Sequence, residues 1–175
     1  NMGLTKSRLI SRAAPMKGVK AIGFAPFLAS DPVMNTVTGV VDLPVTIAPL
    51  VPTGTIARVE VKATGNNIVD TGTFDEATRT NEYVAVNTFF IPGIDIELRN
   101  QIQGYAGILQ TIFIEDYNGK IYVQGAKNGC DVMTLANGTD SQGFSVTINS
   151  KEAEPMYQLA SAAITDYNAA IMPTV

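Results

Sequence analysis

The sequence predicts a mainly β protein, an antiparallel β-sandwich or barrel with one flanking α-helix at about residues 95–105, an N-terminal arm and a long loop. Three observations predict this class. Several short runs alternate apolar and polar residues, as strands with one buried face do. Asn-Gly pairs, which favour tight reversals of the chain, separate some of these runs. Only one segment of the body, 93–107, shows the apolar spacing of a helix.

The composition fits this class and excludes several kinds of active site. The 175 residues are enough for one domain with its own core, and only 16 % are charged, below the usual quarter. There is no histidine, so Ser-His-Asp and Cys-His sites are excluded. Cys130 is the one cysteine, so the chain cannot form an intrachain disulfide. One thiol without any histidine also supplies too few ligands for a zinc site. We therefore expect no catalytic residues, no metal and no cofactor.

Residues 1–17 are interpreted as an N-terminal arm. Residues 1–20 hold five bases and no acid, a charge of +5, whereas the remaining 155 residues hold 7 bases and 16 acids, a charge of −9; the bases are Lys6, Arg8, Arg12, Lys17 and Lys20. Two interpretations stay open. The segment is either a solvated terminus or an assembly arm that docks on the acidic face of another copy. It lacks the apolar centre of a signal peptide, and no run of the chain approaches the ~18 apolar residues of a membrane span.

We expect a single β-sandwich domain over residues 18–157. Its first strand is 18–27, which ends at a proline. A long loop, 28–54, follows, and four prolines punctuate it: Pro32, Pro44, Pro49 and Pro52. A loop of this length inside a compact domain indicates a functional or assembly role. An additional hairpin within it is the alternative.

Two more strands and the helix come next. In the strand 55–64, Arg58 and Glu60 have one parity and Val59 and Val61 the other, which predicts one charged and one buried face. The strand 81–91 ends at a Pro-Gly pair. The helix over 93–107 places Ile94, Leu98, Ile102 and Tyr105 on one stripe, with Asp95 as its N-cap.

The last strands are predicted at 108–116, 120–126, 130–136 and 144–150, as a four-strand antiparallel meander. Asn118 and Gly119 are predicted to form a two-residue turn with positive φ at both positions. Asn128 and Gly129 are predicted to reverse the chain a second time. Residues 158–175 are expected to be a C-terminal tail or an edge strand, and the sequence also allows a short helix there.

The order of these parts is more informative than any one of them. The pattern is a strand pair, a short helix, a hairpin of the form D-x-N-G-K, aromatic strand, G-x-x-N-G, and a closing strand that runs from Gly-aromatic to E-x-x-P. It is carried here by Asp116, Asn118, Gly119 and Lys120, by Gly125, Asn128 and Gly129, and by Gly143, Phe144, Glu152 and Pro155. Over roughly residues 74–157, this chain resembles the major tail-tube proteins of tailed bacteriophages.

The resemblance implies a function in the virion. Tail-tube proteins are β-sandwich or barrel domains that form rings, commonly hexameric, which stack into a hollow tube. DNA passes through that tube without sequence-specific contacts, and a tape-measure protein and tail-end proteins are the other partners. It implies a homo-oligomer assembled in the host cytoplasm, with no membrane partner. The acidic body would then repel phosphates from the bore, and the candidate lumen acids are Asp42, Glu60, Asp70 and Glu115.

The sequence leaves two other classes of function open. A capsid decoration protein or a cell-surface β-sandwich binding module would present aromatic side chains on a face or in its loops. An enzyme could in principle use paired carboxylates, and the sequence has three such pairs: Asp75 with Glu76, Glu115 with Asp116, and Glu152 with Glu154. All three pairs lie at predicted strand ends without a neighbouring His or Trp, so we interpret them as solvated turn charges.

Overall fold

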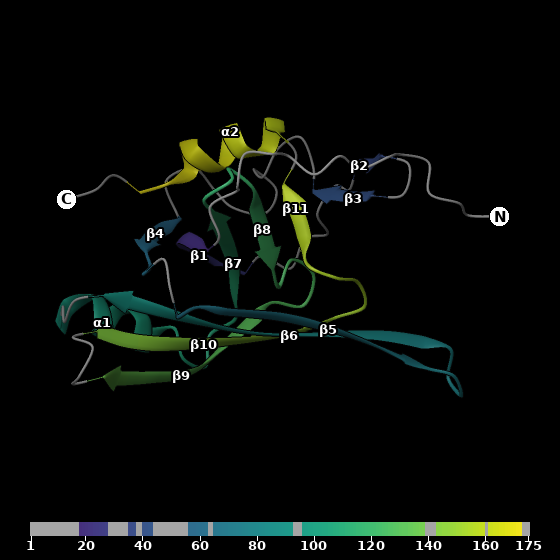
Figure 1. Ribbon diagram of the computed structural model, residues 1–175, viewed down its shortest axis with the longest axis horizontal. Helices are drawn as coiled ribbons and strands as arrows, with labels where there is room; N and C mark the ends of the chain where they lie inside the picture. The colour runs from purple at the N-terminus through teal and green to yellow at the C-terminus, as the bar shows by residue number, and fades with distance from the viewer. Residues whose placement is uncertain are drawn as a thin grey trace.

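The computed structural model describes residues 18–27, 35–37, 40–43, 56–62, 65–92, 96–138, 143–159 and 161–172. They form eleven strands and two helices (Figure 1). The strands are β1 (Val19–Pro26), β2 (Asn35–Val37), β3 (Val40–Leu43), β4 (Ala57–Glu60), β5 (Asn67–Asp75), β6 (Thr80–Pro92), β7 (Gln110–Asp116), β8 (Ile121–Gln124), β9 (Cys130–Gly138), β10 (Gly143–Glu152) and β11 (Tyr157–Leu159). The helices are α1 (Ile96–Gly104) and α2 (Ser161–Ala170).

The strands lie in two layers (Figure 1). We call sheet I the set β4-β1-β7-β8-β11-β3-β2, and sheet II the set β9-β10-β6-β5. Neighbouring strands are antiparallel except for β3 and β11, which are parallel. One backbone pair, Gln110 opposite Cys130, joins β7 to β9 and makes the two sheets one hydrogen-bonded network. The prediction of a mainly β, sandwich-like fold is confirmed.

The main core lies between the two sheets. Sheet I contributes Ile22, Phe24, Ile112 and Ile114, which alternate along β1 and β7 as the pleat requires. Sheet II faces them with Phe89, Ile91, Val132, Phe144, Val146 and Ile148. Cys130 is fully buried in the same core, so it is a packing residue, as its position without a base partner indicates.

A second core lies on the other face of sheet I, under α2 (Figure 1). The residue between the two isoleucines of β7, Phe113, points into it. Helix α2 presents Ala163, Tyr167 and Ala170 to the sheet, at the spacing of one helical stripe. The small alanines let the helix approach closely, and the tyrosine ring lies 5.1 Å from that of Phe113. Of the states that the sequence allowed for the C-terminal segment, the structure therefore has a strand, β11, followed by a helix.

Helix α1 forms where its apolar spacing predicts, and it closes one end of the main core. Ile102 is buried there, and Tyr105, just after the helix, stacks on Phe24 at 5.4 Å between ring centroids. The helix ends at Gly104. The predicted N-cap, Asp95, lies outside the described residues.

The predicted four-strand meander is wrong. β7 and β8 form a hairpin, as predicted, but β8 has β7 and β11 as its neighbours. The reversal after β8 carries the chain out of sheet I, and β9 then pairs along its length with β10 in sheet II. From this place in sheet II, β9 directs Cys130 and Val132 into the core between the sheets, opposite the residues of sheet I.

The segment 28–54 is not a structureless loop. Within it, β2 and β3 form a short antiparallel hairpin, which was the alternative interpretation. β3 then adds to sheet I beside β11, with Asp42 opposite Gln158. The other residues of this segment lie outside the described ones.

Candidate assembly surfaces

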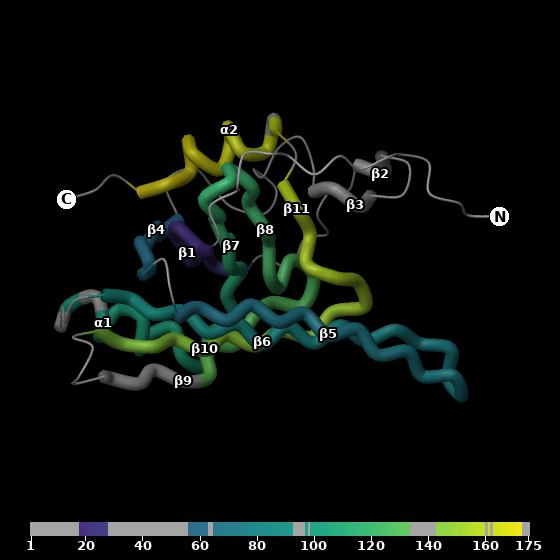
Figure 2. Tube along the Cα trace, viewed as in Figure 1, coloured from purple at the N-terminus to yellow at the C-terminus, as the bar shows by residue number. Residues whose placement is uncertain are grey.

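The most prominent surface feature is the hairpin formed by β5 and β6 (Figure 1, Figure 2). Its strands pair without interruption from Asn67 opposite Thr88 to Asp75 opposite Thr80. The other partner of β6, β10, ends its pairing at Tyr83. The outer part of the hairpin therefore extends past the rest of the described body with no strand on either side.

Large apolar side chains are exposed along this hairpin. Phe74, near the tip, is 59 % exposed, and three more lie closer to the body: Ile68, Val69 and Val86. No described strand pairs with the outer side of β5, so its backbone groups form an open edge. An open edge next to exposed apolar side chains is a surface that soluble monomers normally block.

The tip of the hairpin is held by Asp75. Its Oδ1 accepts the backbone N–H of Ala77 at 2.9 Å and that of Thr78 at 3.3 Å. A hydrogen bond from Thr78 and then the bond from Ala77 lower the pKa of Asp75, because they stabilise the carboxylate. Arg79 completes the reversal with φ of 56°. These local bonds fix the outer end of the hairpin without help from the body.

The inner end of the hairpin is anchored by buried amides. The Asn87 side chain accepts the N–H of Val69 at 2.9 Å and donates to Gln124 Oε1 at 2.9 Å. Gln124 in turn donates to the carbonyls of Ala85 and Ile148. Both amide side chains are fully buried, so these bonds join β5 and β6 to sheet I across the core.

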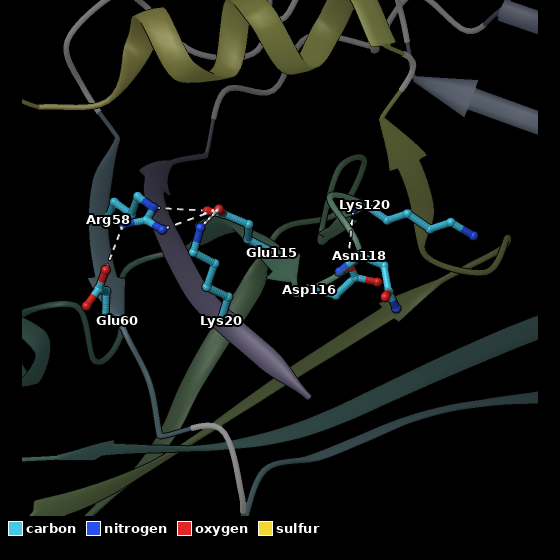
Figure 3. A network of polar contacts seen from close by, with 7 residues as sticks. All are labelled: Lys20, Arg58, Glu60, Glu115, Asp116, Asn118 and Lys120. Carbon is cyan, nitrogen blue, oxygen red and sulfur yellow. Dashed lines mark hydrogen bonds and ion pairs between the residues drawn. The ribbon is translucent and has the colours of Figure 1, made fainter. Parts of the chain in front are cut away.

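A cluster of ion pairs lies on sheet I, on the face that α2 covers (Figure 3). Arg58 on β4 donates to both carboxylate oxygens of Glu115 on β7, at 2.9 and 3.3 Å. The same guanidinium lies 3.5 Å from Glu60, and Lys20 lies 3.8 Å from Glu115. The hydrogen bond with Glu115 raises the pKa of Arg58. Glu115 is thus a partly buried acid whose charge is offset by two bases, and not the solvated turn charge that the sequence predicts.

The structure brings together two of the four candidate lumen acids. Glu60 and Glu115 share Arg58, whereas Asp70 lies on β5 in sheet II and accepts the N–H of Met156 at 2.9 Å. Asp42 lies on β3, at the opposite side of sheet I from β4. The four acids therefore do not line one described face. Of the predicted assembly arm, only Lys20 is described, and it lies in β1; Lys6, Arg8, Arg12 and Lys17 lie outside the described residues.

The turn at Asn118 and Gly119 differs from the predicted one. Glu115 pairs with Ile121, and the N–H of Asp116 bonds the Lys120 carbonyl, so three residues, 117–119, form the loop. Within this loop, Gly119 has a positive φ of 77° and Asn118 does not have a positive φ. The Asp116 carboxylate accepts the N–H groups of Asn118 and Lys120, which makes this three-residue loop favourable (Figure 3).

The second turn, at Asn128 and Gly129, is held by hydrogen bonds to β10. Glu152 on β10 accepts the N–H groups of Lys127 and Asn128, both at 3.1 Å. The Asn128 side chain donates to the Lys151 carbonyl at 2.8 Å. This turn is therefore tied to sheet II, where the chain is about to enter β9.

Next to this turn lies a groove of about 280 Å³, which sequence reasoning missed. Leu109 and Met133, which are 43 % and 59 % exposed, are its apolar lining. Asp131, Asn149 and Lys151 supply polar groups. The lining comes from β9, β10 and the residue before β7, and no single sequence pattern connects these segments.

Comparison of this chain with protein-family models, with curated proteins and with solved structures found no match. Among the described residues, no group of three or more Cys, Asp or Glu side chains is arranged to hold a metal ion. Neither described helix is long and apolar enough to cross a membrane.

Proposed function

We propose that this protein is a tail-tube subunit of a bacteriophage virion, which assembles into rings that stack into the conduit for DNA ejection. The observation that carries the proposal is the β5–β6 hairpin, with its open edge and its exposed Phe74. The sequence resemblance to tail-tube proteins and the sandwich with a flanking helix support the same assignment. By that resemblance, the rings are hexameric.

The edge of β5 lacks the features by which monomers avoid pairing with other chains. Monomers commonly place lysine, proline or a bulge on such an edge. The stretch 67–74 contains one charged residue, Asp70, and its carboxylate is engaged by the N–H of Met156. β5 pairs with β6 in continuous register over its whole length, without a bulge. The edge is therefore suited to accept a strand from a neighbouring copy.

Sheet II has two different edges, and this suits a ring. β5 ends the sheet on one side and β9 on the other, and among the described residues β9 has just one backbone pair on its outer side. A contact between two unlike edges is heterologous, and heterologous contacts generate a closed ring when the rotation between copies closes. Pairing β5 of one copy with β9 of the next would continue sheet II around the ring.

The outer face of sheet II is suited to line a conduit for DNA. Its central strands present Thr88 and Thr147, which share a hydroxyl contact at 3.3 Å. Lys151 is paired with Glu82 at 3.4 Å, which offsets its positive charge. Lys62, whose ammonium lies 5.5 Å from the centre of the Phe90 ring, is a base near this face that has no ion pair among the described residues. With so few bases the face would hold phosphates weakly, so DNA would pass without specific contacts. The tape-measure and tail-end proteins would be the other partners.

The groove beside Asn128 favours one alternative function. A capsid decoration protein or a cell-surface binding module would use a cavity of about 280 Å³ with an apolar lining to bind a partner. Such a module would act as a monomer or a trimer. The oligomeric state therefore separates the two proposals.

The test is sedimentation velocity over a range of concentrations. The wild type should form ring-sized or longer particles as concentration rises, and Val69→Lys and Phe74→Lys should lower that association because each places a charge on the hairpin. Met172→Lys is the matched control, because Met172 is 44 % exposed but follows α2. Its association should equal that of the wild type. A wild type that stays monomeric at all concentrations would exclude the tail-tube proposal.

A further inference from the structure

Two Asn-Gly pairs lie in described turns between strands, one at Asn118 and one at Asn128, and the structure holds them in very different ways. Asn-Gly sequences can modify themselves, because glycine leaves the backbone nitrogen after asparagine open to the side chain. In this reaction the Gly nitrogen attacks the Asn Cγ, a new N–C bond forms and ammonia leaves. Water then opens the resulting succinimide ring, which yields aspartate or isoaspartate.

At Asn118, little in the structure opposes this reaction. Asn118, Gly119 and Lys120 are exposed, and the Asn118 side-chain amide forms no hydrogen bond with any described residue. Asp116 holds the N–H groups on either side, those of Asn118 and Lys120. The attacking nitrogen, that of Gly119, has a single long contact of 3.4 Å to the Asp116 carbonyl.

At Asn128, the same two groups are restrained. Its side-chain amide donates to the Lys151 carbonyl at 2.8 Å, which holds Cγ in place. The Gly129 N–H donates to the Gly125 carbonyl at 3.1 Å, and Gly129 itself is buried. Glu152 fixes the N–H of Asn128 from β10. Reaction there would first have to break these bonds.

We propose that Asn118 is a site of spontaneous deamidation in the folded protein and that Asn128 is protected by its contacts with β10. The product adds a negative charge beside Asp116, and the isoaspartate form also lengthens the main chain of the three-residue loop. A third pair, Asn137-Gly138, lies in β9, where its backbone is paired with Phe144 and Gly143. The inference does not depend on the proposed function.

The test is peptide mapping by mass spectrometry of the folded wild type during incubation in mildly alkaline buffer. Asn118 should convert about tenfold faster than Asn128, which corresponds to about 1.4 kcal/mol of activation free energy. In denaturant the two rates should become similar, because only the fold distinguishes these sites. Equal rates in the folded protein, or a faster rate at Asn128, would overturn the proposal. The proposal would also be overturned if Asn118 converted in the denatured chain but stayed unchanged in the folded protein.

A variant tests the protecting contact separately. Glu152→Ala removes the acceptor of two N–H groups in the second turn, so the rate at Asn128 should rise toward that at Asn118. The rate at Asn118 should stay unchanged. Glu76→Gln, an exposed acid at the hairpin tip, is the control and should alter neither rate. An unchanged rate at Asn128 in Glu152→Ala would contradict the assigned protection.

Discussion

Tyr167 lies where α2 meets sheet I, and its hydroxyl has no hydrogen-bond partner among the described residues. The ring is fully buried against Phe113, next to Gly23, where any larger residue would collide with the hydroxyl. An unpaired buried hydroxyl opposes folding, because it loses its bonds to water without replacement. The Tyr167 ring therefore stabilises the packing of α2 on sheet I, and the unpaired Tyr167 hydroxyl opposes it.

Tyr167→Phe should leave the protein as stable as the wild type at neutral pH or more stable by about 1 kcal/mol, because it removes only the unpaired group. Urea unfolding at neutral pH measures this difference. Tyr167→Ala is the control and should cost about 3–5 kcal/mol, because it leaves a cavity. A marked loss of stability in Tyr167→Phe would show that the hydroxyl has a partner.

Glu115 and Glu60 share Arg58 but should differ in their contribution to stability. The Glu115 side chain is 17 % exposed and that of Glu60 is 76 % exposed. Glu115→Gln should cost about 1–3 kcal/mol, because it leaves a partly buried guanidinium without its carboxylate. Glu60→Gln should cost less than about 0.5 kcal/mol, since exposed ion pairs contribute little. Chemical unfolding of both variants checks this, and equal costs would contradict the assigned difference in burial.

The turns between strands depend on glycines in different ways. Gly125 has φ of 74°, and an added Cβ would lie 2.6 Å from the carbonyl carbon of Gly129. Gly107 has a similar φ of 80°, but no described atom lies within 4 Å of an added Cβ. Both glycines therefore have a positive φ that other residues rarely adopt, but only Gly125 lacks space for a side chain.

Gly125→Ala should cost more than about 3 kcal/mol, because backbone strain and a collision with buried backbone add. Gly107→Ala should cost about 1–2 kcal/mol from backbone strain alone. Thermal unfolding of the two variants gives the comparison. Similar costs would mean that the turn after β8 relaxes around the new methyl group.

The sequence predicts where strands and helices form better than it predicts which strands pair with each other. Alternation predicts the two faces of β4 in part: Val59 packs against the main core, and Arg58 and Glu60 lie on the opposite face, but α2 covers that face as well. The stripe of Ile102 and Tyr105 likewise predicted α1. Pairing depends on which core a strand enters, and no local pattern separates β8 from β9 in that respect. The sequence around Asn128 therefore predicts a meander that the fold does not form.

The candidate surfaces were harder to predict for the same reason. β5 has the sequence NIVDTGTFD, which does not alternate regularly between apolar and polar residues, and it becomes recognisable as half of a long hairpin only through its pairing with β6. The groove beside Asn128 joins segments from three parts of the chain. The candidate lumen acids lie on strands whose faces the sequence does not define, and one of them, Glu115, is paired with Arg58 and Lys20.

The molecule as a whole should lose stability in alkaline solution. Burial raises the pKa of Tyr157 and Tyr167 above 10.0 and that of the Cys130 thiol above 9.0. In the unfolded chain these groups ionise near those ordinary values, whereas in the fold they stay protonated to higher pH. Stability is therefore fully present below about pH 9 and falls as the pH rises through about 10 and beyond.

Urea unfolding at a series of alkaline pH values measures this loss. Tyr167→Phe should lose less stability than the wild type over the same range, because one of the three groups is absent. A wild-type unfolding midpoint that stays constant to about pH 11 would contradict the burial of these groups.

The three-layer body and the protruding hairpin together indicate a protein made to associate with copies of itself. The described body closes two cores, while sheet II keeps an open edge at β5 and another at β9. Electron microscopy of the concentrated, purified protein in negative stain tests this claim most directly. Rings or tubes with a central hole are the expected result. A uniform population of single molecules at high concentration would contradict it.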